Sequence, residues 1–198
     1  MGIAEVLPGR LALVADHLVL ALREPEQADG ASFVLSWYSV AYSADGPGGN
    51  LCFVRWAVGR GGEAILTDTP GLDTVLRQRL SPRSWPLTDP DATAVAATFR
   101  RTPVRDGALE TAIVAPGLEL DVAWRELGPP IVATGKVGGA PTWDSSTVLM
   151  EAGAWSAGLN GAPIAGTPFP NDVWRTWFDR PLSSALVAVA EVFREADA

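Results

Sequence analysis

The residue types that carry most enzyme chemistry are nearly absent from this chain of 198 residues, which has one histidine, His17, one cysteine, Cys52, and one lysine, Lys136. Zinc sites of the Cys₄ or His₃ kind, dithiol redox pairs and c-type haem attachment all need at least two His or Cys residues. One copy of the chain therefore cannot build them, and we expect no metal and no cofactor. His17 follows Asp16, but neighbouring residues of a strand face opposite sides, so Asp16 cannot orient His17 as a general base. We expect His17 to be a hydrogen-bonded structural residue or a surface residue.

Lys136 is the only side chain that could form a Schiff base. It stands in the segment 134–139, Thr-Gly-Lys-Val-Gly-Gly. If its glycine and apolar neighbours desolvated the amine, the pKa of Lys136 would fall and the amine would become nucleophilic. A lysine at the end of a strand is more often solvated, so a Schiff-base enzyme ranks third among the functions considered below.

Glu151 is the candidate catalytic acid, because the segment 148–155 around it is otherwise apolar. On a strand, Glu151 shares a side with Leu149 and Trp155. If that side faced the interior, desolvation would raise the pKa of Glu151, or Glu151 would pair with Arg55. Buried charges seldom persist without a partner or a purpose. The alternative is that this side faces solvent.

The eight tryptophans supply most of the candidate ligand contacts. Trp37, Trp56 and Trp155 fall on predicted strands whose other members are mainly apolar. The simplest interpretation is that they fill the core, but inward-facing aromatic rings can also line a cavity. Arg55 and Lys136 could hold a polar group of the same ligand. The predicted ligand-binding residues are therefore Trp37, Arg55, Trp56, Lys136 and Trp155.

Composition indicates a globular chain with one domain, residues 1–198, because 47% of the residues are hydrophobic and the length suits one sizeable core. The formal charge of −8 disfavours a nucleic-acid surface or an acidic membrane leaflet as partner, since both attract clustered Lys and Arg. The sequence shows no signal peptide and no apolar run long enough to span a bilayer. We therefore expect a cytoplasmic location, with Cys52 unpaired.

Alternation of apolar and polar residues, the mark of strands with one buried face, dominates the chain. The clearest case is 118–125, where Leu120, Val122 and Trp124 share one side. Asn160-Gly161 is the strongest hairpin signal, because both residues tolerate the positive φ of a type I′ turn. The further predicted strands are 11–22, 33–42, 52–58, 63–67, 93–101, 108–114, 131–137, 147–158 and 162–166.

Helical signals are few. Thr69-Pro70 reads as an N-cap followed by a first-turn proline, which predicts a short helix near 70–80. Asn171 could cap a helix over 172–178. A C-terminal helix beginning near Pro181 would place Leu182, Leu186, Val189 and Phe193 on one stripe. The segment 186–192 also fits a buried strand.

About ten short strands joined by tight turns favour a mainly β fold, an antiparallel β-barrel or strongly curved sheet. In outline this resembles lipocalin-like and other calycin barrels. Gly9-Arg10-Leu11 stands where the Gly-x-Trp of lipocalins would open the first strand, so the resemblance is one of shape and assigns no family. A barrel of eight or slightly more strands has room for one small ligand.

The first function considered is therefore a barrel that binds a small, largely apolar molecule, with or without a cofactor-independent isomerisation, cyclisation or hydration that uses Glu151 as acid. The alternative is a non-catalytic interaction or assembly module, such as a homodimer formed through an uncovered sheet face or the terminal helix. The third is the Schiff-base enzyme that depends on Lys136.

Overall fold

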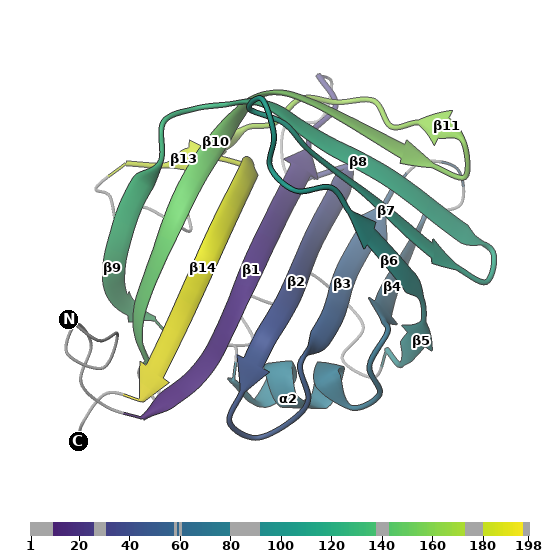
Figure 1. Cartoon of the computed structure of the whole chain (residues 1–198). Coiled ribbons are helices and arrows are strands. Elements are labelled where there is room, and N and C mark those ends of the chain that lie inside the picture. The colour runs from purple at the N-terminus through teal and green to yellow at the C-terminus, as the bar shows by residue number, and fades with distance from the viewer. Residues whose placement is uncertain are drawn as a thin grey trace.

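The computed structural model describes residues 10–25, 31–57, 59, 61–79, 92–137, 143–172 and 180–195. In this part of the chain the fold is mainly β, with one short helix. Figure 1 shows the strands wrapping into a strongly curved sheet that nearly closes into a barrel. No helix of the described residues is long and apolar enough to cross a membrane.

The main sheet runs in the order β5-β4-β3-β2-β1-β14-β10-β8-β7-β6, and β9 and β11 each pair with β10. Every pairing in it is antiparallel except β4 with β5. The strands are β1 Leu11–Leu22, β2 Phe33–Ser43, β3 Gly49–Trp56, β4 Gly62–Thr67, β5 Ala94–Ala96, β6 Thr98–Arg101, β7 Leu109–Ala115, β8 Leu118–Leu127, β9 Ile131–Val137, β10 Trp143–Leu159, β11 Ala162–Pro163 and β14 Ala185–Glu195. A separate pair joins β12 Pro170–Asn171 and β13 Leu182–Ser183.

The long strand β10 belongs to both halves of the curved sheet. Its first part pairs with β14 and β9, and its second part pairs with β8 and β11. The strands β6, β7 and β8 thereby lie over the inner face of β1, β2 and β3, as Figure 1 shows. Trp124 on β8 fixes this arrangement, because its Nε1 donates a hydrogen bond to the Val19 carbonyl of β1 at 2.8 Å.

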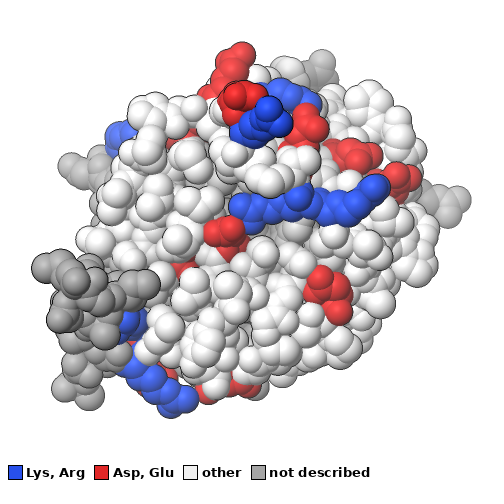
Figure 2. Space-filling view, in the orientation of Figure 1, with Lys and Arg blue, Asp and Glu red and all other residues white. Residues whose placement is uncertain are grey.

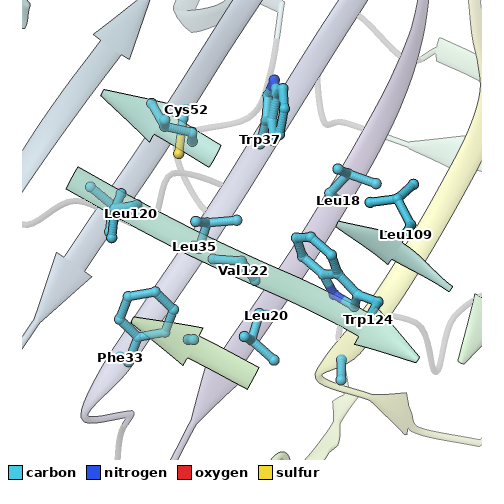
Figure 3. Close-up of a cluster of buried hydrophobic side chains, with 14 of the residues drawn as sticks. Leu18, Leu20, Phe33, Leu35, Trp37, Cys52, Leu109, Leu120, Val122 and Trp124 are labelled. Atoms are coloured by element: carbon cyan, nitrogen blue, oxygen red, sulfur yellow. The ribbon is translucent and has the colours of Figure 1, made fainter. Parts of the chain in front are cut away.

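The inner face holds the largest hydrophobic cluster (Figure 3). Alternate residues of β1 and β2, such as Leu18, Leu20 and Leu35, meet Val122 and Trp124 of β8 there. The prediction for 118–125 is confirmed, since these residues form a strand and Leu120, Val122 and Trp124 are buried.

A second cluster covers the outer face of β1 to β4. Tyr38, Phe53 and Ile65 pack there against Leu72 and Leu76 of the helix α2, Leu72–Arg79. The short helix predicted near 70–80 is therefore confirmed. Its apolar residues four apart on one stripe explain why it docks on the sheet.

The Asn160-Gly161 turn is confirmed as well. Both residues have positive φ, 51° and 76°, and the turn joins the paired strands β10 and β11. Glycine adopts this conformation without steric cost, and asparagine is among the residues that tolerate it best.

The predicted C-terminal helix is wrong, because Ala185–Glu195 forms the strand β14. This strand lies between β1 and β10, and Leu186 and Val187 are both fully buried although they face opposite sides. A central strand covered on both faces has no polar alternation, so its apolar residues also satisfy a helical stripe. The helix predicted over 172–178 falls almost entirely on residues outside the described part of the chain.

Candidate functional site

The predicted ligand-binding tryptophans belong to the packed interior. Trp37 is 1% exposed, and its Nε1 donates to Asn50 Oδ1 at 3.1 Å. Trp56 and Trp155 are partly buried and pack against the same inner cluster. Figure 3 shows Trp37 among leucine, valine and phenylalanine side chains of this cluster. The structure thus places Trp37 in the hydrophobic core and Trp56 and Trp155 at its margin.

The two predicted cationic contacts lie in different places. Arg55 stands opposite Glu63 in the β3–β4 ladder. Lys136 is 67% exposed on β9, and its Nζ lies 3.0 Å from Asp144 Oδ1. The structure does not bring these side chains together, and the exposed Lys136 lacks the apolar enclosure that would activate a Schiff-base amine.

Glu151 is occupied by contacts near the β12–β13 pair. Its Oε1 accepts a hydrogen bond from the Ser183 amide at 2.7 Å, and its Oε2 lies 3.7 Å from Arg180 Nη2. The Glu151 side chain is 32% exposed. These contacts hold β13 against β10, which is a structural role.

A groove of about 520 Å³ lies between α2 and the strands β4 and β5. Its walls include Thr67 at the end of β4, Asp73, Thr74 and Arg77 on α2, and Ala94 and Ala96 on β5. The walls therefore combine hydroxyl, carboxylate and guanidinium groups with small apolar side chains.

Hydrogen bonds fix the turn between β4 and α2 that forms one end of this groove. The Asp68 carboxylate accepts from the Asn50 amide and from Asn50 Nδ2, both at 2.7 Å, and from Thr69 Oγ1 at 2.9 Å. Partial burial by itself would raise the pKa of Asp68, but the hydrogen bonds from Asn50 and Thr69 outweigh it and lower that pKa. Asp68 is thus an ionised anchor that holds the turn in place.

A buried polar cluster on the outer face was not predicted. His17 Nε2 lies 2.7 Å from Ser36 Oγ, and the His17 ring stacks on Tyr38 with centroids 4.0 Å apart. His17 Nδ1 lies 3.8 Å from Glu191 Oε2. Of the two expected environments, a hydrogen-bonded interior position or the surface, His17 thus occupies the first.

Burial controls the protonation of this cluster. Desolvation lowers the pKa of His17 from 6.5 to about 3. Desolvation, with a smaller contribution from the Asp16 charge, raises the pKa of Glu191 from 4.5 to about 8. Near neutral pH both groups are therefore uncharged. Their side chains are only 12% and 4% exposed, so they are closed to a substrate in this conformation.

Asp16 faces away from His17, as the alternation of strand residues predicts. Its Oδ2 lies 2.7 Å from Arg101 Nη1, and its Oδ1 accepts from the Ala190 amide at 2.8 Å. The role of Glu191 could not be read from the sequence, because a helical assignment of β14 gives Glu191 no position relative to His17.

The described residues contain no group of three or more His, Cys, Asp or Glu side chains placed to hold a metal ion. Comparison of the chain with protein-family models, with curated proteins and with solved structures finds no match. Function is therefore inferred from the geometry alone.

Proposed function

We propose that this protein binds a small molecule with an apolar body and one polar group, and that the molecule lies in the groove between α2 and the strands β4 and β5. The groove itself is the observation that supports this proposal. Its volume of about 520 Å³ lies within the range of roughly 300 to 1,000 Å³ that small-molecule pockets occupy.

The chemistry of the walls supports the same ligand class. Ala94 and Ala96 offer an apolar surface without bulky side chains, while Thr74 and Asp73 offer a hydroxyl and a carboxylate from α2. Such a surface suits a compact apolar group that carries a hydroxyl or an amine. The turn anchored by Asp68 is already ordered by hydrogen bonds, so ligand binding would cost little ordering entropy there.

The proposal covers binding and includes no catalytic step. Glu151, the candidate acid, already accepts a hydrogen bond from Ser183 and lies beside Arg180. Lys136 is exposed and paired with Asp144. Neither residue lines the groove.

The test uses a library of small apolar compounds that carry a hydroxyl or an amine, with binding measured by saturation-transfer NMR. We expect Thr74→Trp to abolish binding, because an indole on α2 would fill the groove. Thr98→Trp is the control, since Thr98 is an exposed β6 residue that does not line the groove. Binding that survives Thr74→Trp, or a library without a single binder, would refute the proposal.

A second variant tests whether the Asp73 carboxylate contacts the polar group of the ligand. Asp73→Asn removes the carboxylate and keeps the side-chain shape. We expect amine ligands to lose affinity and neutral alcohols to keep it, because only the amines use the charge.

A further inference from the structure

Ser36, His17 and Glu191 come from three different strands and meet on the outer face of the sheet. Ser36 Oγ on β2 lies 2.7 Å from His17 Nε2 on β1. The other ring nitrogen, Nδ1, lies 3.8 Å from Glu191 Oε2 on β14. A nucleophilic triad has this order of groups, in which a base contacts a hydroxyl through one nitrogen and an acid through the other. Such contacts are often long before a substrate binds and shorten in the complex, so the distance of 3.8 Å is compatible with this role.

The Glu191 carboxyl group has a buried atom without a partner. Glu191 Oε2 accepts no hydrogen bond from any described residue, and the side chain is 4% exposed. An unpaired buried polar atom needs an explanation, because leaving it unpaired costs free energy. His17 supplies a partner when it takes up a proton, since an imidazolium presents an N–H at both ring nitrogens. The pair is therefore completed when His17 has accepted the proton of Ser36.

The surface beside Ser36 offers an approach for a small molecule. Ser36 is 8% exposed, and its neighbours on the outer face, Val19 and Val34, are only half-buried. Arg55 is half-buried as well and lies diagonally from Ser36, because Ser36 pairs with Phe53 and Arg55 is two residues further along β3. A long side chain spans such a diagonal. The Arg55 guanidinium can therefore reach an oxyanion that forms on an acyl group at Ser36.

We propose that Ser36 is the nucleophile of an acyl-transfer site for small esters, and that His17 is its general base. Glu191 positions His17, and Arg55 stabilises the oxyanion. The low exposure of Ser36 restricts the site to short acyl groups such as acetyl. None of these four residues lines the groove between α2 and the strands β4 and β5, so the acyl-transfer site is separate from the proposed small-molecule site.

The reaction has two steps, and His17 carries the proton in both. In the first step Ser36 Oγ bonds to the carbonyl carbon of the ester, and the hydroxyl proton passes to His17 Nε2. The bond from this carbon to the alcohol oxygen breaks, and the alcohol leaves with that proton. In the second step water attacks the acyl group on Ser36 and gives a proton to His17, which passes it to Ser36 Oγ as the carboxylic acid leaves. The net reaction converts one ester and one water into one acid and one alcohol.

The first test follows acetyl transfer from p-nitrophenyl acetate and identifies the modified residue by peptide mass spectrometry. We expect an acetyl group on Ser36 and turnover above that of Ser36→Ala. Acetylation elsewhere is limited, since the chain has one histidine and one lysine. His17→Gln keeps an acceptor for the Ser36 hydroxyl but cannot take its proton, so acetylation should slow by about a hundredfold or more. Ser39→Ala should keep the wild-type rate, because Ser39 is a half-buried serine on the opposite face of β2.

A further variant tests the role of Arg55. Arg55→Met keeps a long side chain and removes the charge, so acetylation of Ser36 should slow by about a hundredfold. A rate equal to that of the wild type would show that Arg55 does not stabilise the oxyanion.

The charged and titratable groups around Glu191 leave it as the group that titrates near pH 8. Burial lowers the pKa of His17 to about 3, and burial together with the Glu191 charge raises the pKa of Tyr38. Asp16 is paired with Arg101 at 2.7 Å. The buried side chains that β10 places on this face are the hydroxyls of Ser145 and Thr147. On the face of the molecule that Figure 2 shows, acidic and basic side chains lie intermixed, so that face adds no strong potential of one sign.

The second test is the pH dependence of acetylation, which a purely structural Glu191 would not produce. An ionised Glu191 stabilises the His17 imidazolium more than a neutral one does. Desolvation, with a smaller contribution from Asp16, raises the pKa of Glu191 to about 8, so the rate after subtraction of the Ser36→Ala rate should rise as the pH passes about 8. Glu191→Gln should retain acetylation and lose this rise. An unmodified Ser36 in the wild type, equal acetylation of Ser36 in His17→Gln, or a rise that persists in Glu191→Gln would each overturn the proposal.

Discussion

His17 and Glu191, 174 residues apart in the chain, meet on the outer face of the sheet with His17 Nδ1 3.8 Å from Glu191 Oε2. A bulge makes this possible, since the β1–β14 register shifts between Ala15 and His17. On β14 the irregularity falls at Ala190, which has φ of 52° and donates its amide to Asp16. The same bulge thus directs Glu191 toward His17 and gives Asp16 a partner on the opposite face.

The first prediction is a pH profile of stability with two limbs. Glu191 has a pKa of about 8 in the folded protein and of 4.5 in the unfolded chain. Its contribution to the free energy of unfolding is therefore complete below pH 4.5 and is lost as the pH rises to about 8. His17 has a pKa of about 3 in the folded protein and of 6.5 in the unfolded chain. Its contribution to the free energy of unfolding is therefore complete above pH 6.5 and is lost as the pH falls to about 3. Between pH 4.5 and 6.5, a rise in pH lowers the free energy of unfolding through Glu191 and raises it equally through His17, so the two effects cancel. Urea unfolding should show a plateau there and a loss of ~2 kcal/mol from pH 6.5 to 8, at 1.36 kcal/mol per pH unit for one proton.

The second prediction assigns the alkaline limb to Glu191. Glu191→Gln keeps the size of the side chain and cannot ionise, so the free energy of unfolding should stay level from pH 6.5 to 8. The acid limb should persist, because His17 still titrates there and the lowered pKa of Asp68 adds to it. Glu119→Gln, at an exposed position on β8, should retain the wild-type profile. An equal alkaline loss in wild type and Glu191→Gln would show that another group causes it.

The positions of most strands could be predicted from the sequence, because a strand with one buried face alternates apolar and polar residues. The predicted bounds 11–22 and 131–137 coincide with those of β1 and β9. Alternation fails for β14, where Leu186 and Val187 are buried on opposite faces. The pattern there carries no period of two, and only the neighbours β1 and β10 make the segment a strand.

The candidate site could be predicted less well, because it depends on register and on backbone partners. Glu151 stands in an apolar segment, as the sequence shows, but its partner is the backbone amide of Ser183. The meeting of His17 and Glu191 requires the bulge at Ala190. The groove needs α2 placed beside β5, a contact that no local pattern encodes.

The third prediction concerns the turn at Gly161, where φ is 76° and no heavy atom outside the turn lies within 4 Å of the point that a Cβ would occupy. Any effect of a side chain there is therefore backbone strain and not a clash. Gly161→Val should lower the free energy of unfolding by about 1 to 2 kcal/mol, because a β-branched residue resists positive φ. Gly161→Asn should cost only a few tenths of a kcal/mol, since asparagine tolerates this region. Equal melting temperatures for the two variants would contradict the strain argument.

The last prediction separates the hydrogen bond of Glu151 from its charge. Glu151→Gln retains an oxygen that accepts from the Ser183 amide and loses only the attraction to Arg180, which is 55% exposed and therefore contributes little. We expect the stability of Glu151→Gln to equal that of the wild type within a few tenths of a kcal/mol. Glu151→Ala removes the acceptor and should cost about 1 kcal/mol, the usual net value of one hydrogen bond. Urea unfolding of the three proteins measures both effects. If Glu151→Gln were as destabilised as Glu151→Ala, the charge of Glu151 and not its acceptor oxygen would be what holds β13 against β10.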